Sequence, residues 1–301
     1  MEKKGYLYII LSAIAFGTMP LMAKYAYGYG SNATSLVFYR AIFSVLPFWI
    51  LAKYVYKQDM RLTRQEIPVL IVLVLGYTMT PILLYNSYYF INSGAAMTLH
   101  FSYPLFITLI VGLGMRKGIN RVERICTVLV TIGIYLMLDI DQLSNVNGSM
   151  LALLSGLTYA IYTVFLGESR LKYINTFKLC FYLTLLTSIL TLIYALATDS
   201  FVASFPLPGW LLLIGFSILI SLGAVVLYQM GVTKVGSKKG GLLSTLEPIV
   251  SVIIGSLFMG ELLSLKEIIS IILIIVSTIL LVSLKDTPKA LDTSLDQMID
   301  H

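Results

Sequence analysis

The chain matches its own second half at a spacing of 144 residues. Over residues 93–136 the match runs without a gap, and a shorter match, at a spacing of 143 residues, starts at Gly5 and Gly148. The identical pairs of the longer match include Ser93/Ser237, Leu99/Leu243, Pro104/Pro248, Met115/Met259, Glu123/Glu267 and Leu136/Leu280. Repetition on this scale predicts that the chain is built from two copies of one structural unit.

Composition then decides the environment of the two copies. Hydrophobic residues make up 58% of the 301-residue chain, charged residues only 12%, and the mean hydropathy is +0.88. This is too little polar surface to cover a water-soluble globule, so the chain is predicted to lie in a lipid bilayer. The net charge of +6 raises the alternative of nucleic-acid binding. The basic residues fall in short loops instead of on one face, however, and no nucleic-acid partner is expected.

Ten apolar stretches are long enough to cross the hydrocarbon core as helices. They cover residues 5–27, 32–54, 67–89, 93–114, 121–139, 148–167, 175–197, 207–230, 240–260 and 265–284. Five fall in each copy, and an odd number of spans places the two copies in opposite orientations. The predicted fold is therefore an all-α membrane protein of ten transmembrane helices in two inverted five-helix repeats. We place the repeats at residues 1–140 and 146–285, and a polar C-terminal tail at 286–301.

Lysine and arginine are distributed unevenly between the two sides of this predicted topology. With the N-terminus in the cytoplasm, 18 of the 21 basic residues fall in cytoplasmic segments. Only Lys24 and Lys266 lie toward the outside, and Arg40 lies within a span. This distribution follows the positive-inside rule, so both termini are predicted to be cytoplasmic. The expected location is the cell membrane, crossed several times, and a compact chain of this length fits a bacterial inner membrane.

Several short motifs follow one another in a fixed order along the chain. They are Tyr39-Arg40 in the second span, Ser93-Gly94-Ala95-Ala96 ahead of Pro104, Leu246-Glu247-Pro248, and Met259-Gly260-Glu261-Leu262. This ordered set, together with the repeat, resembles the EamA family of the drug/metabolite transporter superfamily. The resemblance implies a ten-helix bundle around a central cavity that opens alternately to the two sides. Where the second copy has Gly260-Glu261 the first has Arg116-Lys117, so the fold does not require this glutamate in both halves.

Members of this family mostly move small metabolites: many export amino acids or related compounds, and others import compounds such as choline or riboflavin. The resemblance therefore implies a secondary transporter of a small organic metabolite that works by alternating access. An exporter of amino-acid-like solutes is the leading hypothesis, with protons as a candidate coupling ion. The alternative is an importer of an organic cation such as choline. The expected partners are the small-molecule substrate and the lipid bilayer, and the chain is expected to be a monomer or a homodimer.

Other classes of protein fit the sequence less well. The chain contains no GxxxxGK[ST] loop, so ATP is not expected to drive transport directly. It also contains no HExxH motif, no Ser/His/Asp set and no carboxylate-rich metal motif. We therefore expect no enzyme activity, no catalytic residues, no cofactor and no metal. A non-transporting membrane scaffold is a further alternative, and a cavity with convergent polar groups would argue against it.

Two ionisable residues lie deep in corresponding spans of the two copies. Ionisable side chains inside a bilayer cost several kcal/mol and are by default candidates for function. Glu247 precedes Pro248, and Tyr103 holds the corresponding place in the first copy, while His100 corresponds to Ser244. Two pairs at spacing i, i+3 result, His100 with Tyr103 and Ser244 with Glu247. They are predicted to meet near the repeat axis, where inverted-repeat transporters bind their cargo.

Each of these ionisable residues has more than one predicted role. Glu247 can bind a substrate amine, carry a coupling proton, or accept hydrogen bonds from a neighbouring helix. His100 can contact substrate or a proton, or pack as a lone polar side chain. Arg40 stays charged at any relevant pH and suits a substrate carboxylate; its alternatives are a buried ion pair or an extension to the membrane interface.

Tyrosines in the middle of spans complete the candidate site. They can stack on an aromatic substrate or surround a quaternary ammonium through cation–π contacts, and core packing with a hydroxyl hydrogen bond is the alternative for each. The candidates of this kind are Tyr85, Tyr159, Tyr162 and Tyr228. The full set of predicted substrate- or proton-binding residues adds Glu247, His100, Tyr103, Ser244 and Arg40 to these four.

Overall fold

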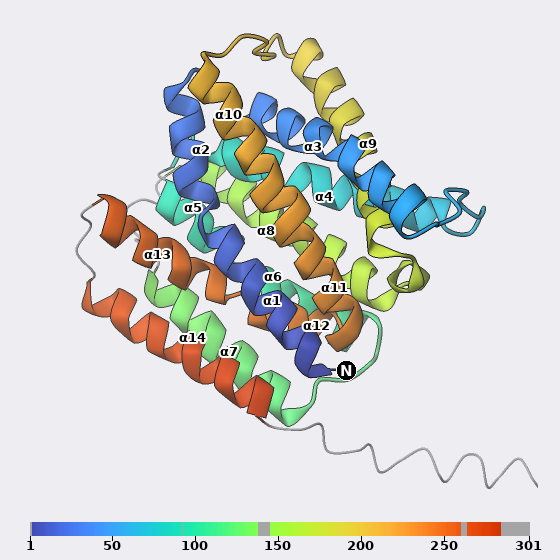
Figure 1. Cartoon of the computed structure of the whole chain (residues 1–301). Helices are drawn as coiled ribbons and strands as arrows, with labels where there is room; N and C mark the ends of the chain where they lie inside the picture. The colour runs from blue at the N-terminus through green and yellow to red at the C-terminus, as the bar shows by residue number, and fades with distance from the viewer. Residues whose placement is uncertain (1, 92, 138–144, 260–263, 284–301) are drawn as a thin grey trace, which may run out of the picture.

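A computed structural model describes residues 2–91, 93–137, 145–259 and 264–283. Every regular element in these ranges is a helix, which confirms the predicted all-α class (Figure 1). Seven helical stretches are long and apolar enough to cross a membrane. They are Glu2–Gly28, Ala33–Val55, Ile67–Ser87, Ala95–Gly114, Val146–Glu168, Thr176–Ala197 and Leu207–Val235. The predicted tail at 286–301 and the Gly260-Glu261 step lie outside the described residues.

The helices follow one another with short connections. The first part of the chain contains α1 (Glu2–Gly17), α2 (Met19–Gly28), α3 (Ala33–Ile50), the π-helical turn η1 (Leu51–Val55), α4 (Ile67–Ser87), α5 (Ser93–His100), α6 (Tyr103–Leu109), the π-helical turn η2 (Ile110–Gly114) and α7 (Arg121–Met137). The second part contains α8 (Val146–Glu168), the 3-10 turn η4 (Arg170–Tyr173), α9 (Thr176–Ala197), α10 (Leu207–Phe216), the π-helix η5 (Ser217–Val225), α11 (Val226–Val235), α12 (Ser237–Leu243), α13 (Leu246–Met259) and α14 (Leu265–Ser283).

Three predicted spans do not belong to these seven stretches. The stretch predicted at 121–139 is α7, and the stretch predicted at 265–284 is α14, which packs along α7 (Figure 1). The stretch predicted at 240–260 is divided between α12 and α13. The structure thus shows an all-helical bundle with seven candidate spans, and ten spans with cytoplasmic termini remain a prediction.

Two long helices are broken at corresponding places in the repeat. α5 and α6 are separated at residues 101–102, and α12 and α13 at residues 244–245. Pro104 lies in the first turn of α6, and Pro248 lies in the first turn of α13. Proline lacks a backbone N–H and fits best where a helix begins, so the repeated proline places a new helix start in each copy.

The outer surface of the bundle is apolar. Large aliphatic side chains there are strongly exposed, with exposed fractions of 47% for Leu75, 62% for Leu211 and 74% for Leu257. An apolar surface of this kind is costly in water and favourable against lipid tails. The described part of the chain therefore presents the exterior expected of a protein that crosses the bilayer several times.

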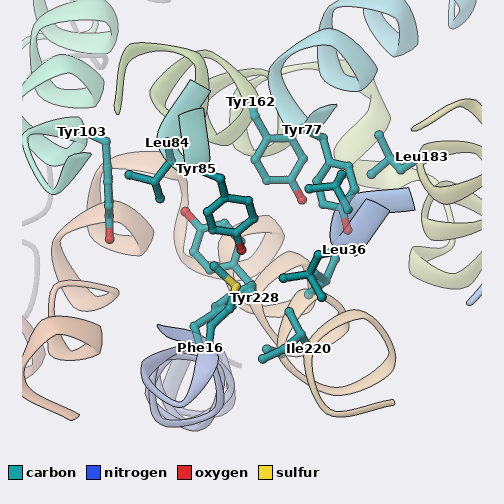
Figure 2. Packing of buried hydrophobic residues seen from close by; sticks show 14 of the residues in the cluster. Phe16, Leu36, Tyr77, Leu84, Tyr85, Tyr103, Tyr162, Leu183, Ile220 and Tyr228 are labelled. Carbon is teal, nitrogen blue, oxygen red and sulfur yellow. The ribbon is translucent and has the colours of Figure 1, made fainter. Parts of the chain in front are cut away.

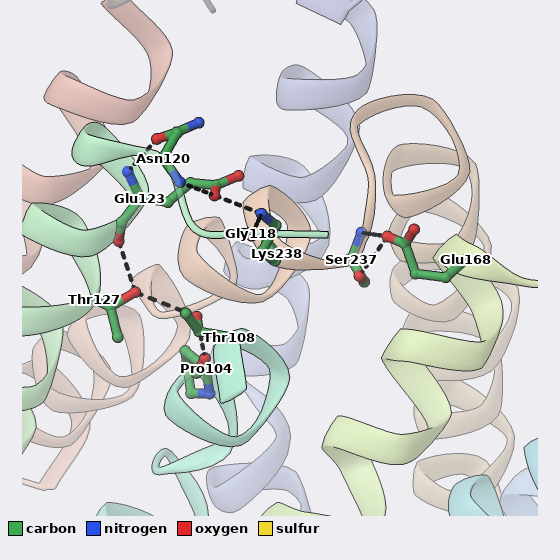
Figure 3. A network of polar contacts seen from close by, with 9 residues as sticks. All are labelled: Pro104, Thr108, Gly118, Asn120, Glu123, Thr127, Glu168, Ser237 and Lys238. Carbon is green, nitrogen blue, oxygen red and sulfur yellow. Dashed lines mark hydrogen bonds and ion pairs between the residues drawn. The ribbon is translucent and has the colours of Figure 1, made fainter. Parts of the chain in front are cut away.

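Ion pairs join helix ends at one end of the bundle. Lys117 Nζ lies 2.5 Å from Glu168 Oε2 at the C-terminus of α8. Lys238 Nζ lies 2.5 Å from Glu123 Oε2, as Figure 3 shows. Glu168 Oε1 also accepts hydrogen bonds from the backbone N–H and the hydroxyl of Ser237, which begins α12. We call this the ion-pair end. It carries basic residues that the sequence places on the cytoplasmic side.

Tyrosines gather at the other end of the bundle. Gln65, just before α4, bonds to Arg170, just after α8, so α4 starts at the ion-pair end and finishes at the opposite one. Tyr88 and Tyr89 follow the last turn of α4, and Tyr27 lies in the last turn of α2. We call the end defined by these three tyrosines the tyrosine end.

Candidate functional site

A cavity lies in the middle of the bundle, between α3, α4, α8 and the broken helices. Its empty space, counted together with the part that is open to solvent, is about 630 Å³. Its walls are formed by Phe16, Met19, Arg40, Tyr77, Thr80, Pro81, Leu84, Met97, His100, Tyr159, Tyr162, Val225, Tyr228 and Glu247. Mostly apolar and aromatic walls with a few convergent polar groups are typical of a binding site for a small organic molecule.

The wall residues recur at helical spacing. Residues three, four or seven positions apart lie on the same face of a helix, so each helix presents a single stripe to the cavity. The stripes are Tyr77, Thr80, Pro81 and Leu84 on α4; Met97 and His100 on α5; Tyr159 and Tyr162 on α8; and Val225 and Tyr228 at the junction of η5 and α11.

Arg40 and Glu247 bring opposite formal charges to this cavity. Their exposed fractions are 6% and 7%, so both side chains are buried. Three ion pairs form within the described part of the chain, and neither Arg40 nor Glu247 belongs to them. The Arg40 guanidinium instead lies over the ring of Tyr77, 5.6 Å from its centroid. The structure therefore shows neither the ion pair nor the interface position that the sequence left open for Arg40.

Hydrogen bonds from three serine hydroxyls to the backbone carbonyl of Arg40 fix this residue in place. The Arg40 carbonyl accepts the hydroxyls of Ser44, Ser217 and Ser221 at 3.0, 3.0 and 3.2 Å. Ser44 is one turn further along α3, while Ser217 and Ser221 belong to η5. These bonds hold α3 against η5 at the depth of the cavity, so the position from which the guanidinium extends is set by packing between helices.

The two broken helices touch beside the cavity. The Tyr103 hydroxyl, in the first turn of α6, lies 2.8 Å from the Ser244 hydroxyl at the break between α12 and α13. Both residues are buried. The structure thus brings together the two helix faces that the repeat predicts to meet, and places His100 and Glu247 in the cavity wall on either side of this contact.

His100 is held by a neighbouring helix and by aromatic rings. Its Nδ1 lies 2.9 Å from the Ser155 hydroxyl of α8. The imidazole centroid is 5.5 Å from the ring of Tyr103 and 5.6 Å from the ring of Tyr159. His100 thus packs against another helix and also lines the cavity, and its contact with substrate or a proton remains a prediction.

The tyrosines form one aromatic group on the cavity floor. Tyr228 stacks on Tyr159 at 5.7 Å and on Tyr162 at 6.5 Å between ring centroids. Figure 2 shows Tyr162 and Tyr228 within the buried cluster. Their hydroxyls are paired within the protein: Tyr228 with Thr163 at 2.8 Å, and Tyr162 as acceptor from Gln229 at 3.1 Å. The rings therefore line the cavity as one packed aromatic surface, while the hydroxyls serve the packing.

Most predicted site residues lie together, and some do not line the cavity. Arg40, His100, Tyr159, Tyr162, Tyr228 and Glu247 form part of its walls. Tyr85, Tyr103 and Ser244 are buried nearby but are not wall residues. The wall residues absent from the predicted set are Phe16, Met19, Tyr77, Thr80, Pro81, Leu84, Met97 and Val225. The sequence does contain a signal for the four wall residues of α4. They start at Tyr77, a tyrosine in the middle of a span, and recur at helical spacing.

The cavity is not a metal centre as far as the chain is described. Within the described residues, no group of three or more His, Cys, Asp or Glu side chains is placed to hold a metal ion. The site therefore offers charge, aromatic faces and hydroxyls, which are groups for recognising an organic molecule.

An apolar helical bundle that encloses a charged, aromatic-lined cavity defines the class of membrane transporters. A family model, the EamA-like transporter family, matches residues 3–139 and again 146–283. The chain belongs to this EamA-like transporter family and is a multi-pass membrane transporter. This confirms the resemblance drawn from the sequence.

Individual relatives agree with the family. The chain is 23% identical over 278 residues to the uncharacterized transporter YcbK of Bacillus subtilis (strain 168), covering 88% of each chain. It is 30% identical over 222 residues to an uncharacterized transporter of Synechocystis, covering 71% of this chain and 66% of the relative. A solved crystal structure superposes with a TM-score of 0.76 at 15% identity, covering 93% of this chain and 98% of the other, which shows that the fold is shared.

Proposed function

We propose that the protein is a secondary transporter of amino-acid-like zwitterions, which it exports by alternating access of the central cavity. The observation that carries this proposal is the presence of buried Arg40 and buried Glu247 in one cavity, without an ion pair between them. A solute with both a carboxylate and an ammonium group supplies a countercharge to each. It thereby offsets the cost of two isolated charges in a low-dielectric site.

The other wall residues support the same class of solute. The planar Arg40 guanidinium can bind a carboxylate through two parallel hydrogen bonds. Glu247 can accept hydrogen bonds from an ammonium group, and the stacked ring of Tyr228 adds a cation–π surface. The apolar wall residues Phe16 and Leu84 favour a solute with an apolar side chain.

The proposal includes proton coupling, because the Glu247 carboxyl group has two alternative ligands. Glu247 can hold either a proton or the ammonium group of the solute, but not both. Alternation between the two would exchange protons for solute across the membrane. We further propose the ten-span inverted topology with cytoplasmic termini and residence in the cell membrane, supported by the repeat and by the distribution of basic residues.

Purified protein in detergent and in proteoliposomes tests the proposal. L-Leucine, L-phenylalanine, L-glutamate and choline are compared as ligands in thermal unfolding and as labelled solutes in transport. We expect the neutral zwitterions to raise the Tm and to be transported, faster with an opposing pH gradient. Glu247→Gln keeps side-chain size and removes the charge, and Arg40→Gln replaces the guanidinium with a shorter neutral amide. Each should lower transport about 100-fold, because each leaves one charge of the solute unpaired. Wild-type transport by both variants would sink the proposal.

Import of an organic cation is the second candidate function. The stacked rings of Tyr159 and Tyr228 favour it, since aromatic faces bind quaternary ammonium groups. Arg40 opposes it, because a like charge in the same cavity repels a cation. Arg40→Gln separates the two candidates: it should abolish transport of L-leucine but leave or improve transport of choline if choline is the natural class of substrate.

A further inference from the structure

Two tyrosine hydroxyls, one beside the cavity and one at the tyrosine end, have no hydrogen-bond partner within the described residues. Among the described residues, the hydroxyl oxygens of Tyr27 and Tyr85 are buried and form no hydrogen bond within the protein. A buried hydroxyl without a partner raises the free energy of the folded state, so folded proteins retain few of them. These two call for an explanation other than stability.

Tyr85 borders the cavity on the side of the tyrosine end. It follows the wall residue Leu84 and lies four residues after the wall residue Pro81, on the same face of α4. Arg40 and Glu247 are both close enough to interact electrostatically with its hydroxyl. Figure 2 shows Tyr85 among the labelled side chains of the buried cluster, which include Leu84 and Tyr228.

Further tyrosines continue from Tyr85 to the surface. The ring of Tyr88 lies 5.7 Å from that of Tyr85, measured between centroids. Tyr27 of α2 is close enough to interact electrostatically with both Tyr85 and Tyr89. Tyr89 is 72% exposed. The end of α4 and the residues after it thus lead, through Tyr85, Tyr88 and Tyr89, from the edge of the cavity to the exposed tyrosine end.

Other tyrosines around the cavity differ in their hydrogen bonding. The hydroxyls of Tyr103, Tyr162 and Tyr228 all have partners within the protein. The hydroxyl of Tyr77 is buried without a partner, as are those of Tyr27 and Tyr85. Tyr77 belongs to the cavity wall itself and lies under the Arg40 guanidinium, whereas Tyr85 and Tyr27 lie outside the wall.

We propose that Tyr85 and Tyr27 form a second binding subsite for the transported solute, on the side of the cavity that faces the tyrosine end. This rests on the proposed transport of a zwitterion. A phenol hydroxyl donates to a carboxylate and accepts from an ammonium group. Each hydroxyl can thus replace a hydrogen bond that the solute loses as it leaves Arg40 and Glu247, which lowers the barrier between cavity and surface.

The first test measures stability. Tyr85→Phe and Tyr27→Phe remove only the hydroxyl oxygen, and because neither oxygen has a protein partner, the Tm of the purified protein should stay the same or rise. Tyr228→Phe is the matched control: it leaves the Thr163 hydroxyl without its partner and should lower the Tm by roughly 2–4 °C. A similar fall in Tyr85→Phe would overturn the proposal, since it would reveal a structural role for that hydroxyl.

The second test measures transport in proteoliposomes with L-leucine as the probe. The initial rate should fall about tenfold in Tyr85→Phe and in Tyr27→Phe, the loss expected for one hydrogen bond to a charged group. Equilibrium binding of L-leucine in detergent should change less than about threefold, because both residues lie outside the cavity wall. Tyr25→Phe, on the same helix and 56% exposed, is the control and should behave as wild type. Wild-type rates in both test variants would refute the subsite.

A third test does not depend on L-leucine being the solute. Tyr27→Cys is treated with a membrane-impermeant methanethiosulfonate reagent that carries a trimethylammonium group, added to one side of the vesicles. Tyr89→Cys identifies the tyrosine end, and Leu75→Cys on the lipid-facing surface is the negative control. The wild-type chain, with Cys126 and Cys180 buried, gives the background. We expect Tyr27→Cys to react from the side that labels Tyr89→Cys; no reaction there would exclude a solute path past Tyr27, even if the zwitterion proposal itself had failed.

Discussion

The two broken helices share a backbone course but carry different chemistry. Their breaks, at residues 101–102 and 244–245, lie 143 residues apart, close to the repeat spacing. The α5–α6 break presents His100 and Tyr103, two groups that are paired with Ser155 and Ser244. The α12–α13 break presents Glu247, whose carboxyl group faces the cavity and belongs to none of the ion pairs in the described ranges.

Glycines extend this comparison to the packing around each break. A Cβ atom added to Gly156 of α8 would lie 2.7 Å from the His100 carbonyl oxygen. A Cβ atom added to Gly17 of α1 would lie 3.0 Å from the Glu247 carbonyl oxygen and 2.5 Å from Val250 Cβ. At each break, a glycine of a neighbouring helix thus packs directly against the backbone of the broken helix. The fold depends on the break and this close approach, whereas the side chains beside it are free to differ and to provide a binding site.

The largest expected effect tests whether the two close approaches are equivalent. Gly156→Ala and Gly17→Ala each place a methyl group inside contact distance of a backbone carbonyl, which has no flexible end to move away. We expect each to lower the free energy of unfolding by about 2–3 kcal/mol, the cost of overpacking a tight contact. Thermal unfolding of the purified variants in detergent measures this effect.

Gly215→Ala is the matched control for these two substitutions. Gly215 lies in α10 with no atom within 4 Å of the added Cβ, so the exchange should be neutral or stabilise the helix by up to about 1 kcal/mol. If Gly17→Ala proved harmless while Gly156→Ala was destabilising, the two breaks would not be packed alike, and the comparison would hold for the backbone course alone.

The sequence analysis predicted one span at 93–114 and one at 240–260, and the structure divides each into two helices. The signal for both breaks is nevertheless local. Pro104 and Pro248 occupy matching places, and the lack of a proline N–H limits where a helix can run on. The contact of Tyr103 with Ser244 was also predictable, since inverted repeats bring corresponding helices to a common axis. The span at 121–139 was harder to assess, because Arg121 and Glu123 open α7 and reduce its apolar length.

Other contacts in the site depend on how the helices pack against one another. The hydrophobic periodicity of the sequence does not encode this packing. Ser155, the partner of His100, is 55 residues away along the chain. Tyr77 lies under the Arg40 guanidinium because α3 and α4 adopt one particular relative position. A search for charged partners would not have found it, since the ring is uncharged. The site residues that the sequence missed are therefore chiefly those selected by tertiary packing.

A second, smaller effect tests the contact that joins the two broken helices. Tyr103→Phe and Ser244→Ala each remove one side of the 2.8 Å hydroxyl pair. We expect a coupling free energy of about 1 kcal/mol in a double-mutant cycle, the usual net value of a buried neutral hydrogen bond. The cycle is measured by thermal unfolding. Additive single effects would mean that the helices are held together by apolar packing alone.

The smallest expected effects on stability concern the ion-pair end. There a second set of contacts connects the two broken helices. Lys238 of α12 pairs with Glu123 of α7, and the Glu123 carbonyl accepts the hydroxyl of Thr127, which lies 3.2 Å from the Thr108 hydroxyl of α6 (Figure 3). This chain of contacts links the second broken helix to the first. The Lys117 pair with Glu168 lies nearer to solvent: the Lys117 side chain is 49% exposed, against 16% for Lys238.

The exposed fractions of the two lysine side chains therefore predict which substitution costs more stability. Lys238→Gln should lower the free energy of unfolding by about 1 kcal/mol, because Glu123 stays buried without its charged partner, whereas Lys117→Gln should cost roughly 0.5 kcal/mol or less. Thermal unfolding at low salt and at about 1 M salt separates the two pairs further, since salt screens exposed charges most. The effect of Lys117→Gln should vanish at high salt and that of Lys238→Gln should persist. The reverse order would mean that the shielded link between the broken helices contributes less to the fold than the exposed pair beside it.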